Sequence, residues 1–229
     1  MSISSPQKLL NKIPLFNSLS DSDLENLSES VRLQSLKKGQ TLFRKGDEGS
    51  SLYIIKQGTI KIVLPSRLGD EVIVTMFSAG DFFGEMALFD GKPRSADALA
   101  MEPSQIYVLN RNDFLIFLQS NINAMKSILS QLTNRLRNTD DFLESTCFLS
   151  VSARLAKKLL ELAESYGQND GDKVYIDLSL TQKEIGDMIG STRESINKEL
   201  KILRDKGLIT MQENKIQIVD ITRLKRRAY

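Results

Sequence analysis

The 229-residue sequence contains no histidine and a single cysteine, Cys147. Zinc centres built on His or Cys clusters, Ser-His-Asp and Cys-His nucleophilic devices, histidine-ligated haem and iron–sulfur clusters held by several cysteines of one chain all need residues that this chain lacks. Cys147 has no partner for an intrachain disulfide, and we interpret it as a small apolar residue. We therefore expect neither a metal site nor an enzyme.

The chain also lacks a hydrophobic run long enough to cross a membrane. Residues 1–10 contain no long apolar stretch and no small-residue cleavage pattern. Hydrophobic residues make up 41% of the chain, which is enough to bury two modest cores. A cytoplasmic protein of one or two domains, with no membrane partner, is expected.

Charge is nearly balanced over the whole chain, with a net value of +2, but it is unevenly distributed. Residues 150–229 contain 15 Lys and Arg against 12 Asp and Glu, a net charge of +3, and residues 1–149 contain 16 against 17, a net charge of −1. This bias by itself is a weak indication of nucleic-acid binding, and it gains weight only from where the charges lie.

Residues 1–120 predict a short helix followed by an antiparallel β-domain. Residues 20–31 place Leu24, Leu27 and Val31 at helical spacing. Runs rich in β-branched and aromatic residues then predict strands over residues 41–43, 51–55, 60–64, 71–77, 95–100 and 105–109. Glycines at positions 46, 58, 69, 80 and 91 recur every eleven or twelve residues, as is typical of corners with positive φ. The prediction is an antiparallel β-roll or jelly roll in a chain of the α+β class.

Residues 121–149 predict one long helix with a heptad repeat, because the spacing alternates between three and four residues. The members of this repeat are Ile122, Met125, Leu129, Leu132, Leu136, Thr139, Leu143 and Thr146. A narrow stripe of this kind faces a partner helix, so we expect a homodimer. Thr139 lies where the repeat ordinarily holds Leu, and its hydroxyl either sets the register of the helix pair or contacts a ligand. Arg135 and Asp140 have the spacing for a salt bridge between the two chains.

Residues 83–96, here called the cassette, concentrate the polar chemistry of the first domain. Gly84 lets the backbone approach a ligand, and a short helical turn beginning there would direct free N–H groups at an anion. Arg94 has a fork of donors suited to phosphate, Ser95 adds a hydroxyl, and Glu85 can accept from a ribose hydroxyl. The alternative is a barrel corner at which an exposed Arg94 pairs with Glu85 or Asp97.

The joint pattern resembles the phosphate-binding cassette of the cyclic-nucleotide-binding domain. The resemblance covers Phe83-Gly84-Glu85-Met86-Ala87-Leu88, a spacer of five residues, and Arg94-Ser95-Ala96. The ligand-binding residues that it implies are Gly84, Glu85, Met86, Ala87, Arg94 and Ser95. In that family, the residues matching the glycine, the glutamate, the arginine and the serine hold the sugar and the cyclic phosphate inside the β-roll.

Residues 150–229 predict a winged helix-turn-helix. Residues 151–166 form an amphipathic helix and residues 167–171 a polar loop. Two helix starts, at residues 181–184 and 191–194, fit the capping box. Gly190 supplies the turn between these helices, and Gly186 allows them to cross closely. Residues 208–211 and 216–219 predict the hairpin of the wing.

The first turns of the second helix are the candidates for reading DNA bases. Arg193 can bind guanine O6 and N7, Glu194 can accept from cytosine N4, and Lys198 can reach another guanine. Glu194 is also the third helical residue (N3) in the second capping box, so two roles compete for one carboxylate. The residues expected to contact DNA are Thr192, Arg193, Glu194, Ser195, Asn197 and Lys198, with Thr181, Lys183 and Lys201 assigned to phosphate. The basic tail at residues 223–227 is either a solvated end or a further backbone contact.

A cyclic-nucleotide domain (residues 1–120), a long dimer helix (residues 121–149) and a winged helix-turn-helix domain (residues 150–229), in this order, resemble the cyclic-AMP receptor protein and FNR superfamily of bacterial regulators. In the cyclic-AMP receptor protein, a threonine and the neighbouring serine on the central helix contact the adenine, one of them from the partner subunit. Thr139 matches the threonine and Asp140 replaces the serine, which leaves base selectivity open. The family's Arg-Glu-x-x-x-Arg reading triplet matches Arg193, Glu194 and, conservatively substituted, Lys198.

The function that this resemblance implies is a ligand-responsive homodimeric transcription regulator that binds double-stranded DNA. The expected effector is a cyclic nucleotide, with cyclic AMP first and cyclic GMP or cyclic di-GMP as alternatives, and no catalytic cofactor is expected. Another small effector, or none, stays open as an alternative. A contact with RNA polymerase, the direction of regulation and the operator beyond a two-fold site are open as well.

Overall fold

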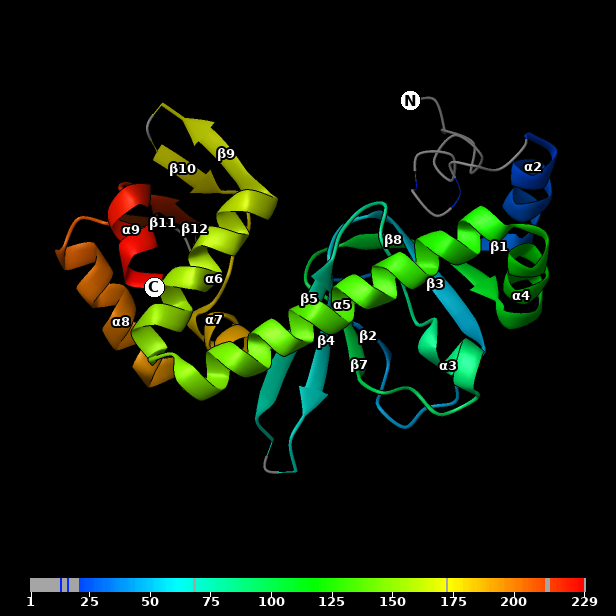
Figure 1. Ribbon diagram of the computed structural model, residues 1–229, viewed down its shortest axis with the longest axis horizontal. Helices are drawn as coiled ribbons and strands as arrows, with labels where there is room; N and C mark the ends of the chain where they lie inside the picture. The colour runs from blue at the N-terminus through cyan, green and yellow to red at the C-terminus, as the bar shows by residue number, and fades with distance from the viewer. Residues whose placement is uncertain are drawn as a thin grey trace. The chain divides into compact units, whose positions relative to one another are not determined.

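The structure of the protein is a computed structural model (Figure 1). It describes residues 13, 16, 21–67, 69–171, 173–212 and 215–228. Contacts divide the chain into two compact units, Met1–Arg137 and Asn138–Tyr229. The boundary between the units falls inside the long helix α5 (Ile122–Phe148).

The first unit is built on two antiparallel four-stranded sheets. One sheet has the order β1 (Val31–Leu36), β8 (Ser104–Asn110), β3 (Ser51–Gln57) and β6 (Phe82–Phe83). The other has the order β2 (Thr41–Phe43), β7 (Asp97–Ala100), β4 (Ile60–Pro65) and β5 (Glu71–Phe77). This arrangement confirms the predicted antiparallel β-domain. Pattern analysis missed β1 and β6, because β1 follows directly on helix α2 (Asp21–Ser30) and a two-residue strand has no alternation to detect.

The recurring glycines lie at the corners of this β-roll. All five, at positions 46, 58, 69, 80 and 91, have φ between 68° and 95°, a region that residues with a side chain rarely adopt. At Gly58 a side chain would also collide with Ser104, whose Oγ lies 2.2 Å from the position of an added Cβ. The predicted role of these glycines as turn residues is confirmed.

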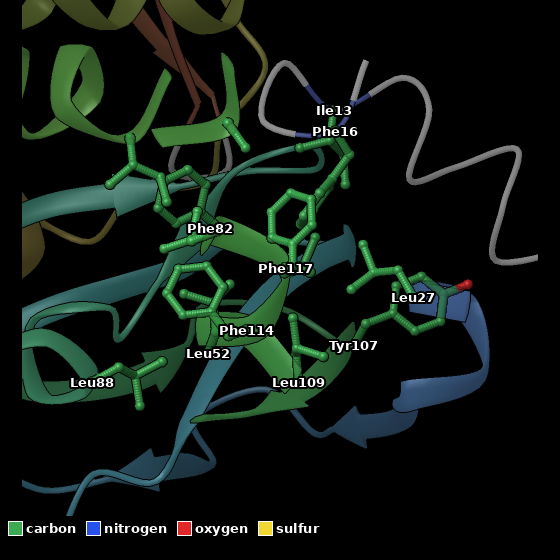
Figure 2. Packing of buried hydrophobic residues seen from close by; sticks show 14 of the residues in the cluster. Ile13, Phe16, Leu27, Leu52, Phe82, Leu88, Tyr107, Leu109, Phe114 and Phe117 are labelled. Atoms are coloured by element: carbon green, nitrogen blue, oxygen red, sulfur yellow. The ribbon is translucent and has the colours of Figure 1, made fainter. Parts of the chain in front are cut away.

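The core of the first unit joins helices to strands. Helix α4 (Arg111–Ser120) begins at Asn110, whose side chain accepts a hydrogen bond from the backbone N–H of Asp113. Figure 2 shows two phenylalanines of α4, Phe114 and Phe117, packed in one cluster with Leu52 of β3. A second cluster is made by strands of both sheets and includes Phe77 and Phe83. The cassette therefore begins on a strand that is anchored in the core.

The long helix α5 has two apolar faces, of which the heptad pattern revealed only one. Ala124 and Ile128 are buried in the core of the β-roll, and Met125 and Leu132 pack partly against it. The large apolar heptad residues that stay exposed are Ile122, Leu129, Leu136 and Leu143, which are 67%, 56%, 63% and 61% exposed and recur every seven residues. The two threonines of the repeat, Thr139 and Thr146, are exposed as well. Met125 and Leu132 therefore pack partly against their own domain, and the expectation that all eight positions of the repeat face a partner helix stays a prediction.

The second unit is a three-helix core with a small sheet. Its helices are α6 (Val151–Tyr166), α7 (Gln182–Ile189) and α8 (Arg193–Asp205). Its sheet has the order β11 (Ile209–Gln212), β12 (Lys215–Ile218), β10 (Lys173–Ile176) and β9 (Gly167–Asp170). A final helix, α9 (Ile221–Ala228), packs on α6 (Figure 1). The predicted winged helix-turn-helix is confirmed.

Two predictions for this unit are wrong. Residues 167–170, expected as a polar loop, form the edge strand β9, whose residues Gly-Gln-Asn-Asp carry no strand signal and pair with β10 through the backbone. Residues 223–227, expected as a basic tail without regular structure, lie in helix α9, whose only buried residues are Leu224 and Ala228. A helix this short depends on tertiary packing, which a local sequence pattern does not reveal.

Within the described ranges, no helix is long and apolar enough to cross a membrane.

Candidate functional site

The cassette leaves the core through a turn that only glycine fits. Strand β6 ends at Phe83, Gly84 follows with φ of 85°, and helix α3 (Met86–Asp90) begins two residues later. A Cβ added to Gly84 would lie 2.7 Å from Nη1 of Arg94 and 3.1 Å from the ring of Tyr53. Gly84 therefore serves both the turn and the close approach of the Arg94 side chain.

The guanidinium of Arg94 is buried inside the β-roll, with the residue only 5% exposed. Nη1 donates to the carbonyl of Gly84 at 2.6 Å, and Nη2 donates to the carbonyl of Ser51 at 2.8 Å. Asp97, the other partner considered for Arg94, instead accepts from the backbone N–H of Lys45. The alternative of an exposed arginine at a barrel corner is therefore wrong.

Two aromatic rings hold the Arg94 head. Its Cζ lies 4.4 Å from the ring centroid of Phe43 and 5.3 Å from that of Tyr53, distances at which a cation is attracted to a ring face. Burial lowers the pKa of Arg94, whereas the neighbouring Tyr53, Glu85 and Asp47 act to raise it. Sequence reasoning missed both aromatic residues, because they lie on β2 and β3, far from the cassette in the chain.

Gly49 is a second residue that sequence reasoning missed. A Cβ added there would lie 2.3 Å from Cβ of Ala87 and 3.1 Å from Nε of Arg94. Gly49 and Gly84 thus leave the space that the arginine head fills. Gly49 lies only three residues after Gly46, whereas the turn glycines at positions 46, 58, 69, 80 and 91 are spaced eleven or twelve residues apart. This irregular spacing is the sequence signal that could have revealed Gly49.

Glu85 is also buried, at 3% exposed, and pairs with the helix α5. Its Oε1 accepts from Nη1 of Arg135 at 2.8 Å. Arg135 also donates to the carbonyl of Phe82, and its Cζ lies 4.5 Å from the ring centroid of Phe77. The heptad spacing predicted a salt bridge from Arg135 to Asp140. Within one chain the guanidinium pairs with Glu85, and the salt bridge to Asp140 of a second chain stays a prediction.

Two buried polar atoms of the cassette lack a hydrogen-bond partner among the described residues. They are Oε2 of Glu85 and Nε of Arg94. Buried polar groups are nearly always hydrogen-bonded, and leaving one unpaired is unfavourable by about 1–3 kcal/mol. A ligand that offers a hydroxyl to the carboxylate and an anionic oxygen to the guanidinium would satisfy both atoms. The residues therefore fit a sugar phosphate.

The other predicted ligand residues are distributed less compactly. Ala87 is buried beside Gly49, whereas Met86 is 53% exposed. Ser95 is exposed, and its hydroxyl contacts the sulfur of Met86 at 3.7 Å. Thr139 and Asp140 are exposed residues of the second unit. Within the first unit the structure thus brings together Gly84, Glu85, Ala87 and Arg94.

The helix-turn-helix is formed by α7, the turn at Gly190 and α8. The first capping box is confirmed, because the Thr181 side chain accepts from the N–H of Glu184 and the Glu184 carboxylate accepts from the N–H of Thr181. Gly190 ends α7 with φ of 62°. A Cβ on Gly186 would lie 2.7 Å from the carbonyl of Ser191, so the close crossing needs this glycine.

The second capping box is wrong. Thr192, not Ser191, is the N-cap of α8, and its side chain accepts from the N–H of Ser195 at 3.2 Å. Ser191 belongs to the turn, where its N–H donates to the carbonyl of Gly186. Glu194 is therefore the second helical residue rather than the third, and the expected competition for its carboxylate is removed.

The exposed side of α8 carries the polar residues that the sequence assigned to DNA. Ile196, Leu200 and Leu203 are buried. The exposed residues are Arg193, Glu194, Asn197, Lys198 and Lys201. Ser195 is half-buried in the cap, and Thr181 and Thr192 are exposed caps. Lys183 pairs with Asp187 at 2.8 Å, so a phosphate contact by this lysine would compete with that carboxylate.

Comparison with known proteins gives two matching family models. Residues 33–121 match the cyclic nucleotide-binding domain, and residues 153–227 match the Crp-like helix-turn-helix domain. The chain is also 30% identical over 221 residues to the CRP-like cAMP-activated global transcriptional regulator of Mycobacterium tuberculosis, covering 96% of this chain and 99% of that relative. The chain belongs to the CRP/FNR superfamily of transcription regulators.

Further relatives and solved structures match this chain over most of their own length. The cAMP-activated global transcriptional regulator CRP of Pasteurella multocida is 33% identical over 83% of this chain and 91% of its own length. A CRP-family transcriptional regulator from Thermus thermophilus is 26% identical, with a TM-score of 0.72 over 85% of this chain and 96% of that one. The c-di-GMP responsive global regulator CLP of Xanthomonas campestris has a TM-score of 0.76 over 88% of this chain and 100% of that one, at 21% identity. The superfamily consists of ligand-responsive DNA-binding proteins.

Proposed function

We propose that this protein is a homodimeric transcription regulator whose affinity for a two-fold symmetric operator is controlled by cyclic AMP bound in the β-roll. The observation that carries the proposal is the pair of buried polar atoms without partners, Oε2 of Glu85 and Nε of Arg94. One is an acceptor and the other a donor, as a ribose hydroxyl and a cyclic phosphate require. Two relatives that match over most of the chain are named as cAMP-activated, which favours cyclic AMP over other cyclic nucleotides.

In this proposal each residue of the cassette has one task. The Nη atoms of Arg94 stay on the carbonyls of Gly84 and Ser51, which orients Nε toward a phosphate oxygen. The hydroxyl of Ser95 exchanges its weak contact with the Met86 sulfur for a second bond to phosphate. Gly84 has no side chain to block the ligand.

The ion pair between Glu85 and Arg135 offers a route from the ligand to the long helix. Oε1 of Glu85 holds Arg135 of α5, so a ribose hydroxyl on Oε2 changes the charge distribution that Arg135 experiences. A ligand shifts a conformational equilibrium only through such a difference in contacts between two states. We infer that Arg135 couples ligand binding in the β-roll to the conformation of α5.

The homodimer rests on the exposed heptad residues of α5. Ile122, Leu129, Leu136 and Leu143 form a seven-residue repeat of large exposed side chains, which a second copy of the same helix would cover. In a parallel pair the two α8 helices would be related by two-fold symmetry, with half-sites one helical turn of DNA apart.

The proposal is tested by calorimetry of the purified protein with cyclic AMP, cyclic GMP and cyclic di-GMP, followed by DNA titration with the ligand that binds. Arg94→Ala is expected to lose nucleotide binding and the ligand-dependent gain in DNA affinity together, because it removes the donor that would bind the phosphate. Lys92→Ala, a nearby exposed cation, is the matched control. Unchanged nucleotide binding in Arg94→Ala would remove the cassette from the mechanism, and binding of cyclic di-GMP alone would replace cyclic AMP as the effector.

A further inference from the structure

Helix α9 carries four basic residues and no acidic residue within its eight positions. Leu224 and Ala228 are buried, and the helix packs on α6 through this side. The basic residues are Arg223, Lys225 and Arg226, which are exposed, and Arg227, which is half-buried. At about 100° per residue, Arg226 lies opposite the buried pair and the other three flank it on both sides. The outward face of α9 therefore consists of basic side chains and exposed Thr222.

Helix stability accounts for only part of this charge. Cations stabilise the last turn of a helix through its dipole, and Lys225, Arg226 and Arg227 lie in that turn. Arg223 lies in the first turn, where a cation is unfavourable. Asp220 offsets it only weakly, with a nitrogen–oxygen distance of 3.9 Å. The charge on α9 therefore needs a second explanation.

The rest of the DNA-binding half has no net positive charge. Residues 150–229 contain 15 Lys and Arg against 12 Asp and Glu, and four of the 15 lie on α9, so the other residues carry 11 against 12, a net charge of −1. Helix α8 itself contains four basic and three acidic residues. Association with DNA is driven largely by basic side chains that displace counterions from phosphates. In this chain α9 supplies the positive charge that the base-reading helix lacks.

We propose that the outward face of α9 binds the phosphate backbone of double-stranded DNA. Charge complementarity argues for this occupant, because guanidinium groups pair with phosphate through two parallel hydrogen bonds. The contact is independent of sequence and of effector: it strengthens binding to any duplex and leaves the choice of bases to α8.

The test compares the salt dependence of binding to a random-sequence duplex without effector. The variant Arg223→Gln/Lys225→Gln/Arg226→Gln removes three exposed charges and keeps good helix formers. The variant Arg32→Gln/Lys37→Gln/Lys38→Gln removes the same charge from exposed positions of the first unit. The slope of log affinity against log salt falls by about 0.9 for each phosphate that the protein no longer neutralises. We expect the slope to fall by about 2.7 in the α9 variant and to stay unchanged in the control.

The outcomes separate this proposal from the proposed function. An unchanged slope in the α9 variant, or an equal fall in both variants, would overturn the DNA contact. If DNA binding is unchanged but transcription with RNA polymerase falls, an acidic protein surface is the partner instead. The ratio of operator to random-DNA affinity should stay constant in the α9 variant. A wild-type protein without operator preference would refute the regulator and still leave the slope comparison decisive for α9.

Discussion

At the scale of single residues, the proposed ligand site depends on side chains that hold Arg94 rather than on Arg94 alone. The ring centroids of Phe43 and Tyr53 lie 5.5 Å apart, and both rings lie against the guanidinium of Arg94. A long side chain buried on two ring faces keeps one orientation, so its donors are already directed when a ligand arrives.

Phe43→Leu is expected to lower nucleotide affinity about twofold to thirtyfold, because a cation–ring contact is worth about 0.5–2 kcal/mol. The single variant Phe43→Tyr should keep the wild-type nucleotide affinity, since the tyrosine ring attracts the guanidinium equally well. Leu42→Ala, which removes a neighbouring side chain from the same core cluster but keeps both rings that hold Arg94, should lower the melting temperature and leave affinity unchanged. Isothermal titration and thermal melts decide the matter. Equal loss of affinity in Leu42→Ala would indicate packing instead of positioning.

At the scale of elements, α5 has two apolar faces, one packed on its own domain and one exposed. Ala124 and Ile128 attach it to the β-roll, and the exposed leucines stay available to a second subunit. Substitutions on the two faces should have different effects. Replacing an exposed side chain should leave the stability of the folded monomer nearly unchanged, so any effect on dimerisation can be measured separately.

Leu129→Ser/Leu136→Ser is expected to weaken the dimer at least a thousandfold, since burial of each leucine stabilises by about 1.5–3 kcal/mol and a dimer contains four of them. Sedimentation equilibrium measures the change, and circular dichroism should show an intact helix content. Ile116→Ser, on the exposed side of α4 at 63% exposure, is the control and should leave the dimer intact. A double-serine variant that remains dimeric at micromolar concentration would contradict the assignment of this face.

At the scale of the whole molecule, regulation requires that occupancy of the β-roll alters DNA affinity. The ion pair between Arg135 and Glu85 joins the cassette to α5 within the first unit. If this pair reports the ligand, removing it should separate binding from response.

Arg135→Met is expected to bind cyclic AMP but to lose most of the ligand-induced gain in DNA affinity, which for coupled sites is typically about 5-fold to 150-fold. The measurement is the ratio of DNA dissociation constants with and without saturating nucleotide. Some loss of stability, about 1–3 kcal/mol, should accompany it, because the Glu85 carboxylate stays buried without its cation. Arg137→Met, an exposed arginine two residues further along α5, should keep the full ratio. A normal ratio in Arg135→Met would transfer the coupling to other contacts.

Local pattern predicted most of the fold. Alternating strands, periodic glycines, the long helix and the first capping box were all readable, because each depends on residues close together in the chain. Elements without a local signal, such as β6, β9 and α9, form only because a neighbouring strand or helix covers them. The N-cap of α8 shows the same limit, since Ser191 and Thr192 are both good caps and the turn decided between them.

The sequence by itself determined the chemistry of the site, through Gly84, Glu85 and Arg94 at their spacing, and the polar surface of α8. Only the tertiary structure decided how that chemistry is held. The residues that contact the cassette come from β2, β3, a loop and α5: Phe43, Tyr53, Gly49 and Arg135. Contacts between residues so far apart in the chain produce no local sequence pattern from which they could be predicted. The physical reason is that local backbone preferences depend on near neighbours, whereas burial of a charge depends on every element that folds around it.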